Sequence, residues 1–190
     1  MNASAGLAAV LLNSFFVFEG RSRVGDAARS LDPGAQDRGT TRLIGASFGA
    51  SLVLFALSTW LAVAGIGVLP PALAWAGAVV MILGIVLRLW SAAVLGASYT
   101  RTLRVSAGQR LIRSGPYRFL RHPGYAGSIL LWTGAALASG GALGVVTIIP
   151  LTLWAYLRRV AAEDRMLVAR FGDEYAAYVR EVRRLVPFVY

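Results

Sequence analysis

From Leu43 to Ala97 the chain carries one charged residue, Arg88, in a stretch long enough to cross a lipid bilayer twice. A spanning α-helix needs about 20 mainly apolar residues, because the hydrocarbon core is about 30 Å thick and a helix rises about 1.5 Å per residue. Pro70-Pro71 interrupts the stretch near its middle. Since backbone polar groups must be satisfied internally in lipid, we expect two transmembrane helices, over residues 43–69 and 72–97.

The composition places the whole chain in the membrane class. Apolar residues make up 57% of the 190 residues and the mean hydropathy is +0.63, whereas soluble domains are about 45–50% apolar. The length fits one domain, residues 1–190. The chain has no cysteine, which excludes disulfides, thiol nucleophiles and thiolate metal sites. We therefore expect an all-α integral membrane protein of a single domain.

Three shorter apolar runs complete the expected bundle. Residues 3–18 form a short first span; a signal peptide is the alternative, but the run lacks a basic leading region and a small-residue cleavage site. We expect residues 126–138 and 142–157 to form a helical hairpin around a serine-glycine-glycine turn. Five spans result. A four-span arrangement without the first run would move only the N-terminus to the other side.

The charges predict the orientation in the membrane. All 19 basic residues are arginines, and all but Arg88 lie in segments 21–42, 101–121 and 158–184, whereas the turns near residues 70 and 140 carry no charge. Cationic loops are retained in the cytoplasm. We expect a protein of the bacterial inner membrane whose charged segments face the cytoplasm. Anionic lipid headgroups or an anionic cofactor would suit the net charge of +10, and nucleic acid is not expected as a partner.

The polar linker 98–125 separates the third and fourth spans and holds the candidate site. With an amphipathic C-terminal helix from residue 158 onward it would form a cytoplasmic cap, which makes 98–190 the catalytic region. The linker contains the only histidine, His122, between Arg121 and Pro123. Arginine can clamp a carboxylate with two hydrogen bonds, and neutral histidine offers one donor and one acceptor. Without a second histidine a metal site is not expected. The alternative is a re-entrant turn that only connects two spans.

Three further charged residues need interpretation. Glu163 and Asp164 are adjacent, so on a helix they point about 100° apart and would serve different partners. Arg159 precedes Glu163 by four residues, which leaves an ordinary intrahelical ion pair as an alternative role. Arg88 lies inside the third span. An intramembrane arginine is costly and is therefore a candidate substrate-binding residue, unless its long side chain reaches back to the interface.

Together these residues resemble a known family. The pattern runs Gly115-Pro-Tyr-Arg-x-x-Arg-His-Pro-x-Tyr-x-Gly127, then Glu163-Asp164, then Phe171-Gly-x-x-Tyr175-x-x-Tyr178, and closes with Pro187-Phe188. It is similar to the isoprenylcysteine carboxyl methyltransferase family, and the phospholipid N-methyltransferases share part of it. The resemblance covers about residues 85–190. It implies methyl transfer from S-adenosylmethionine, with S-adenosylhomocysteine as product, inside a helical membrane bundle.

The resemblance also implies roles for individual residues. It places Arg121, Arg159 and Asp164 nearest the transferred methyl group and the acceptor. The residues that it places around the cofactor are Gln109, Tyr117, His122, Pro123, Tyr125, Gly127 and Glu163. Asp164 departs from the family pattern, which has a second glutamate there. The chain also lacks the family's longer eukaryotic C-terminal tail, so a prenylated protein substrate is not implied.

The expected function is methyl transfer to a lipophilic acceptor in the membrane, with a carboxylate favoured over an amine or a hydroxyl. A carboxylate acceptor needs no base, whereas Asp164 would take the proton of an amine or a phenol. Two alternatives remain from the sequence. One is an NADPH-dependent membrane reductase, because sterol-reductase-like proteins share a similar arginine-histidine-proline segment. The other is a non-catalytic membrane scaffold or transporter.

Overall fold

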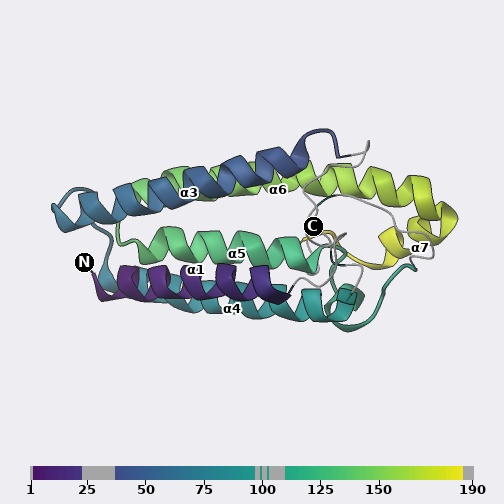
Figure 1. The fold of residues 1–190 in the computed structure, drawn as a ribbon, viewed down its shortest axis with the longest axis horizontal. Helices are drawn as coiled ribbons and strands as arrows, with labels where there is room; N and C mark the ends of the chain where they lie inside the picture. Colours follow the sequence, from purple (N-terminus) through teal and green to yellow (C-terminus); the bar gives the residue numbers. More distant parts are fainter. Residues whose placement is uncertain (1, 23–36, 97–98, 100–101, 103–109, 186–190) are drawn as a thin grey trace.

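The computed structural model describes residues 2–22, 37–96, 99, 102 and 110–185, and over these residues the regular structure is helical (Figure 1). The expected all-α membrane fold is confirmed. The helices are α1 Ala3–Ser22, α3 Thr40–Val63, α4 Pro71–Leu95, the 3₁₀ turn η2 Gly115–Arg118, α5 Pro123–Ala138, α6 Ala142–Phe171 and α7 Asp173–Glu181.

Five of these helices form an elongated bundle, and four of them are long and apolar enough to cross a membrane. These four are α1, α3, α4 and α6. The fifth, α5, has 16 residues and is therefore only about 24 Å long. It lies inside the bundle, where it packs mainly against α4 and also against α6 (Figure 1). Most of its residues are buried, so protein rather than lipid surrounds it.

The helix ends differ from the expected spans. The helix expected over 43–69 starts at Thr40 and stops at Val63. It stops because Gly65 and Gly67 adopt positive φ angles, of 82° and 61°, in the loop that follows. The last span was expected over 142–157, but α6 continues past residue 157 and ends at Phe171. The whole helix has 30 residues. The run expected over 3–18 likewise continues to Ser22, so that Glu19 belongs to a helix and not to a loop.

Glycines bring the backbones of α4 and α5 into direct contact. A Cβ atom on Gly84 would lie 2.4 Å from the backbone nitrogen of Leu131, and one on Gly134 would lie 2.3 Å from that of Met81. Real side chains do not approach a backbone so closely. Small residues at such crossings are a common way of packing helices in membranes. This close packing fixes the start of α5 relative to Arg88 on α4.

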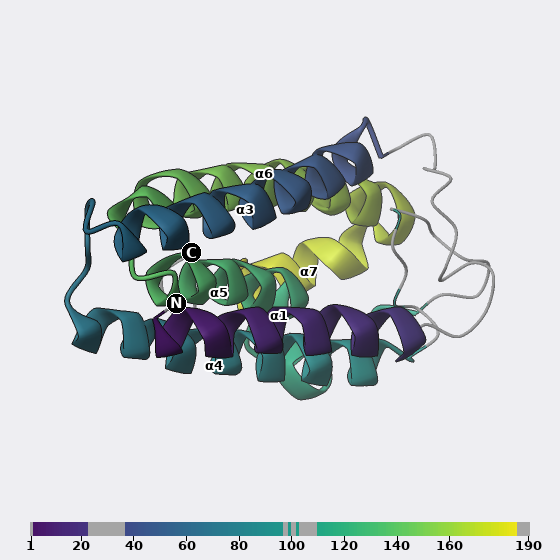
Figure 2. The same ribbon diagram turned by 60° about the vertical axis from the view of Figure 1, so that its left-hand side comes forward.

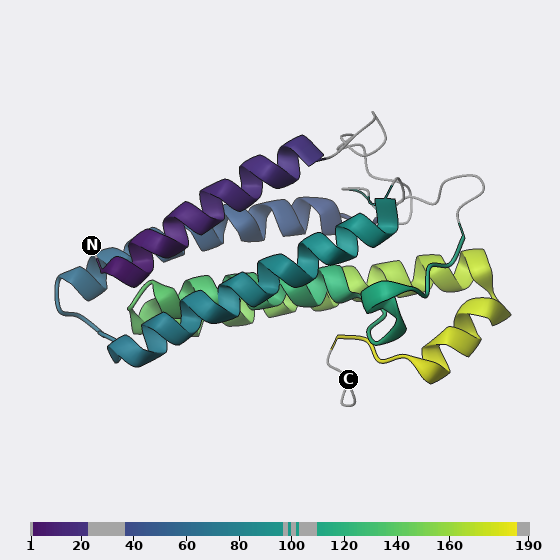
Figure 3. The same cartoon turned by 90° about the horizontal axis from the view of Figure 1, so that it is seen from below.

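The two ends of the bundle differ in chemistry. At the uncharged end Ser58 on α3 hydrogen-bonds Ser139 at 2.9 Å, and the backbone nitrogen of Leu69 donates to Gly140 at 2.8 Å. At the other end α6 extends beyond its neighbours, the chain turns at Gly172, and α7 packs back beside η2 (Figures 2 and 3).

The cap at the charged end is built from the described part of the linker and from the C-terminal segment. The backbone nitrogens of Arg121 and His122 donate to the carbonyls of Arg183 and Arg184 at 2.7 and 3.2 Å. Arg113 donates to the carbonyl of Glu174 on α7 at 2.8 Å. These contacts hold the start of α5 against the chain that follows α7.

Candidate active site

A cavity of about 440 Å³ opens at the charged end of the bundle. Its size falls within the range of about 300–1,000 Å³ found for small-molecule sites. The polar part of its lining includes Arg121, His122 and Glu163. The apolar part includes Phe16 of α1 and Phe48 of α3. The cavity therefore offers both charged and apolar side chains to a ligand.

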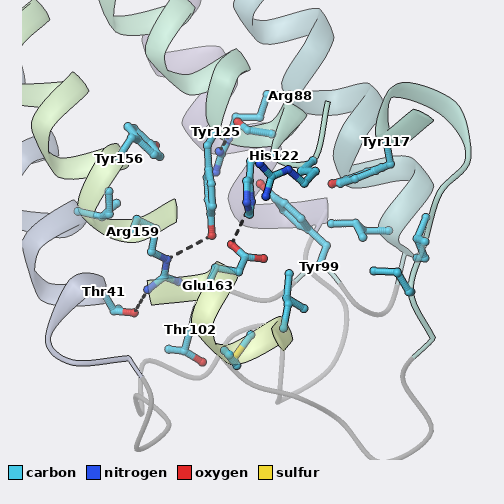
Figure 4. A pocket seen from close by; sticks show the side chains of 18 of the residues that line it. Thr41, Arg88, Tyr99, Thr102, Tyr117, His122, Tyr125, Tyr156, Arg159 and Glu163 are labelled. Carbon is cyan, nitrogen blue, oxygen red and sulfur yellow. Dashed lines mark hydrogen bonds and ion pairs between the residues drawn. The ribbon is translucent and has the colours of Figure 1, made fainter. Parts of the chain in front are cut away.

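The structure brings most of the expected site residues to this cavity. Those that line it are Arg121 and, as labelled in Figure 4, Arg88, Tyr117, His122, Tyr125, Arg159 and Glu163. Three others do not line it. Pro123 is buried as the first residue of α5, Gly127 faces the backbone of α4, and Asp164 lies behind His122. Gln109 lies outside the described residues.

Asp164 connects four parts of the cap. Its Oδ1 atom lies 2.7 Å from His122 Nε2 and accepts a hydrogen bond from the Tyr175 hydroxyl at 2.5 Å. Its Oδ2 atom lies 3.0 Å from Arg184 Nε, and Arg121 Nη1 lies 3.6 Å from its Oδ1. A carboxylate held by so many partners fixes the positions of those partners. Asp164 therefore orients His122 from behind and does not face the cavity.

Among the described residues, two acids line the cavity: Glu19, which is paired with Arg88, and Glu163. The Oε2 atom of Glu163 lies 3.8 Å from His122 Nδ1, which is too long for a hydrogen bond (Figure 4). This oxygen is buried and has no hydrogen-bond partner among the described residues. A buried acceptor without a partner is costly, and a ligand that donates a hydrogen bond would remove the cost. The two adjacent carboxylates were expected to serve different partners, but both approach His122, from its two ring nitrogens, and of the two only Glu163 lines the cavity.

Arg159 reaches the cavity from α6 and is held on two sides. Its Nη1 atom donates to Asp37 Oδ1 at 2.5 Å and to the hydroxyls of Thr40 and Thr41 at 2.8 and 2.9 Å. Its Nε atom donates to the hydroxyl of Tyr125 at 3.2 Å (Figure 4). Asp37 forms a close ion pair with Arg159 at 2.5 Å, and the charge of Glu163, four residues further along α6, also acts on Arg159.

Asp37 is adapted to this pairing. Burial by itself raises the pKa of its carboxyl group, but hydrogen bonds from the Thr41 hydroxyl and backbone, together with the positive charge of Arg159, hold that pKa below its ordinary value. Its side chain is 1% exposed. Asp37 is therefore an ionised carboxylate enclosed in protein.

Arg88 does not reach toward the membrane surface. Its Nη2 and Nε atoms donate to Glu19 Oε1 at 2.6 and 3.1 Å, and its Nη1 atom donates to the Gly124 carbonyl at 3.2 Å. It is 8% exposed, and the Tyr99 hydroxyl donates to the same Glu19 oxygen at 2.7 Å. Arg88 thus lines the cavity as one half of a buried ion pair between α4 and α1.

Tyrosines form much of the remaining wall. The ring of Tyr125 stacks on His122 with centroids 5.7 Å apart and 13° between the ring planes. In the cap, burial raises the pKa of Tyr117 and of Tyr175 above the ordinary value, and burial raises the pKa of Tyr178 to about 12. These cap hydroxyls therefore stay protonated near neutral pH. The Tyr178 hydroxyl donates a hydrogen bond to the Tyr117 carbonyl.

Sequence reasoning missed Glu19 and Asp37. Both precede the recognisable motif, and both stand in a segment whose charges look like those of an ordinary surface loop. A signal existed for Glu19, because a buried arginine in a membrane needs a partner and Glu19 directly follows an apolar run. Nothing in the sequence distinguishes Asp37 from the other acids of residues 19–42.

Comparison with known proteins gives matches in sequence and in structure. A family model described as phospholipid methyltransferase matches residues 72–174. A probable protein-S-isoprenylcysteine O-methyltransferase of Oryza sativa subsp. indica is 32% identical over 118 residues, which are 60% of this chain and 61% of that protein. Methanethiol S-methyltransferase 1 of Bradyrhizobium diazoefficiens is 35% identical over 72 residues, 38% of this chain and 24% of that protein.

Among solved structures, a eukaryotic intramembrane Ras methyltransferase, isoprenylcysteine carboxyl methyltransferase, has a similar fold. The TM-score is 0.63 at 26% sequence identity, and the match covers 76% of this chain and 52% of that chain. The chain thus spans about three fifths of the rice relative and about half of the solved one.

Proposed function

The chain belongs to the phospholipid methyltransferase family, and from that premise we propose that it transfers a methyl group from S-adenosylmethionine to a lipophilic acceptor held in the membrane. The observation that carries the proposal is a cavity lined by both charged and apolar side chains. The charged residues suit a charged nucleoside, and apolar residues such as Phe16 of α1 and Phe48 of α3 suit the hydrocarbon part of an acceptor.

The polar residues of the lining fit the methyl donor. S-adenosylmethionine carries a sulfonium, an ammonium and a carboxylate, so its site needs acidic groups as well as arginines. Glu163 offers to a ligand donor a buried oxygen that has no hydrogen-bond partner among the described residues, and Tyr117 and Tyr125 line the same cavity. With His122 these residues would hold the donor. Pro123 and Gly127 would act through the backbone shape of α5, and Gln109 is proposed to contact the adenine.

Once bound, S-adenosylmethionine supplies an electrophilic methyl group, and the chain's contribution is alignment. Holding two reactants in line can supply about 7–11 kcal/mol of the barrier. Stacked Tyr125 and His122 give the wall a fixed shape, and the fully enclosed Tyr156 closes its inner side against water. A site that works by aligning its reactants needs few side chains that take part in the reaction themselves.

We favour a carboxylate acceptor, because the rice relative is named for O-methylation and because Arg121 and Arg159 both line the cavity. Either guanidinium would orient a carboxylate, and no proton would have to be removed. For an amine or hydroxyl acceptor the base would be Glu163 and not the expected Asp164, since Glu163 lines the cavity and Asp164 does not. Glu19, the other acid of the lining, already accepts hydrogen bonds from Arg88. The Bradyrhizobium relative is named for methylation of a thiol, so membership of the family leaves the acceptor open.

The first test measures cofactor binding. Purified protein titrated with S-adenosylhomocysteine in a calorimeter should bind it, and Glu163→Gln should weaken binding at least about tenfold, because it removes a charge-assisted hydrogen bond. Glu181→Gln, at an exposed position on α7, is the matched control and should bind like the wild type. A folded protein that binds NADPH instead of S-adenosylhomocysteine would overturn the proposal in favour of a reductase.

The second measurement identifies the acceptor class. Membranes containing the protein are incubated with methyl-labelled S-adenosylmethionine, and the labelled lipid is extracted and treated with alkali. A methyl ester releases its label, whereas a methylamine, a methyl ether or a thioether keeps it. Retention of all label would contradict the carboxylate while leaving methyl transfer in place.

A further inference from the structure

We propose that Asp37 is a positioning residue of this site: it holds the guanidinium of Arg159 so that Arg159 in turn fixes Tyr125 in the cavity wall. The inference rests on the proposed methyl transfer and adds a residue from outside the matched segment 72–174. Asp37 itself does not line the cavity. Any effect that it has on the reaction must therefore pass through the neighbours that do line it, which are Arg159 and Thr41.

The contacts of Asp37 define one geometry for Arg159. The Asp37 carboxylate accepts from Arg159 Nη1 at 2.5 Å and also from the hydroxyls of Thr40 and Thr41 at 3.1 and 2.7 Å. Both threonine hydroxyls accept from the same Nη1 atom. Because the guanidinium group is planar, fixing Nη1 also fixes the direction in which Nε points.

The backbone after Asp37 is bent to make this arrangement. Arg38 and Gly39 both adopt left-handed conformations, with φ angles of 49° and 78°. The first is uncommon for a residue other than glycine. The double bend lets the Asp37 carboxylate turn back to accept a hydrogen bond from the backbone nitrogen of Thr41 at 3.1 Å. The carboxylate thus caps the start of α3 and faces Arg159 at the same time.

The position of Arg159 is passed on to the cavity by stacking. Arg159 Nε donates to the Tyr125 hydroxyl, and the Tyr125 ring lies between His122 and Tyr156, with centroid distances of 5.7 and 5.5 Å. A shift of the guanidinium would release this hydroxyl and loosen the wall against which the reactants align. A misplacement of about 1 Å can reduce a rate by about a hundredfold.

The experiment compares Asp37→Asn with Asp37→Glu in the purified full-length protein. Asp37→Asn should lower kcat by about 10- to 100-fold, while the KM for S-adenosylmethionine changes less than about threefold, because every side chain proposed to touch the donor is kept and only the alignment of Tyr125 is loosened. Asp37→Glu keeps the charge and should recover most of kcat. Thr41→Val removes a neutral partner of Arg159 and should give a smaller loss of kcat.

The control for lost stability is Ser58→Ala, which removes buried hydrogen bonds at the opposite end of the bundle. It should lower the melting temperature and leave kcat unchanged. If Asp37→Asn changes kcat no more than Ser58→Ala does, or if Asp37→Glu does not recover it, Asp37 is only structural and the inference is wrong. A folded wild-type protein that binds no S-adenosylhomocysteine and transfers no methyl group would instead overturn the proposed function and this inference together.

Discussion

Glu19 and Asp37 show how single carboxylates make buried arginines tolerable near lipid. Each accepts hydrogen bonds from one arginine of the cavity, Arg88 or Arg159, and from neighbouring hydroxyl groups. A buried charge without a partner is strongly destabilising, whereas a well-bonded pair has a small net cost. The two arginines therefore depend on residues that lie 69 and 122 positions away in the chain.

The pair between Glu19 and Arg88 gives a prediction for stability. Glu19→Leu should lower the free energy of unfolding by about 3–5 kcal/mol, because it leaves the guanidinium of Arg88 buried without its counter-charge. The double variant Glu19→Leu with Arg88→Met should recover most of the loss, since both charges are then gone. Thermal unfolding in detergent measures both effects. A double variant less stable than Glu19→Leu alone would contradict this account.

At the same scale, the motif residues could be predicted from the sequence but their partners could not. Arg121, His122, Arg159 and Glu163 were predicted for the site, and all of them line the cavity. Asp164 was expected there too, and its side chain instead holds His122 from behind. A helical position gives the direction of a side chain but not which element packs against it. That depends on the tertiary fold.

Among the helices, the packing of α4 on α5 depends on the absence of side chains at the crossing. The sequence predicts both helices, but it does not show that α5 is the enclosed one. Its 16 residues look like an incomplete span until the glycines of α4 are seen to face it. The length of α6 was missed for a related reason, because the change from apolar to charged residues after Tyr156 looks like the end of a span while the helix continues.

Gly134→Ala tests this crossing. The added methyl group would lie 2.3 Å from the backbone nitrogen of Met81 and 2.5 Å from the carbonyl oxygen of Gly77, so the helices must separate. Overpacking of this kind typically costs about 1–3 kcal/mol. Gly49→Ala is the control, since nothing lies within 4 Å of its added Cβ atom. It should keep or slightly raise the melting temperature, because alanine favours a helix. Equal effects of the two substitutions would contradict the packing argument.

The molecule as a whole has one charged and one uncharged end, and the charges predict which end faces the cytoplasm. The loop of residues 64–70 lies at the uncharged end and α7 lies at the other (Figure 1). Retention of arginine-rich segments would keep α7 and the cavity on the cytoplasmic side. The donor would then enter from the cytoplasm, and the acceptor from the lipid.

The absence of cysteine from the sequence makes this orientation directly measurable. Ile66→Cys and Glu181→Cys each introduce one exposed thiol, at opposite ends of the molecule. A maleimide that cannot cross membranes should label Ile66→Cys on intact cells and Glu181→Cys only after the cells are made permeable. The reverse pattern would show that the charged end faces outward.

The continuous course of α6 has a consequence for how the protein depends on its lipids. At 30 residues the helix is about 45 Å long, and the hydrocarbon core is about 30 Å thick. Apolar side chains therefore anchor one end of α6 in the bilayer, and toward its other end the same helix carries Arg159, Glu163 and Asp164. The depth of these groups below the lipid headgroups is set by bilayer thickness and by the tilt of the helix. Hydrophobic mismatch would consequently act directly on the end that carries the cavity.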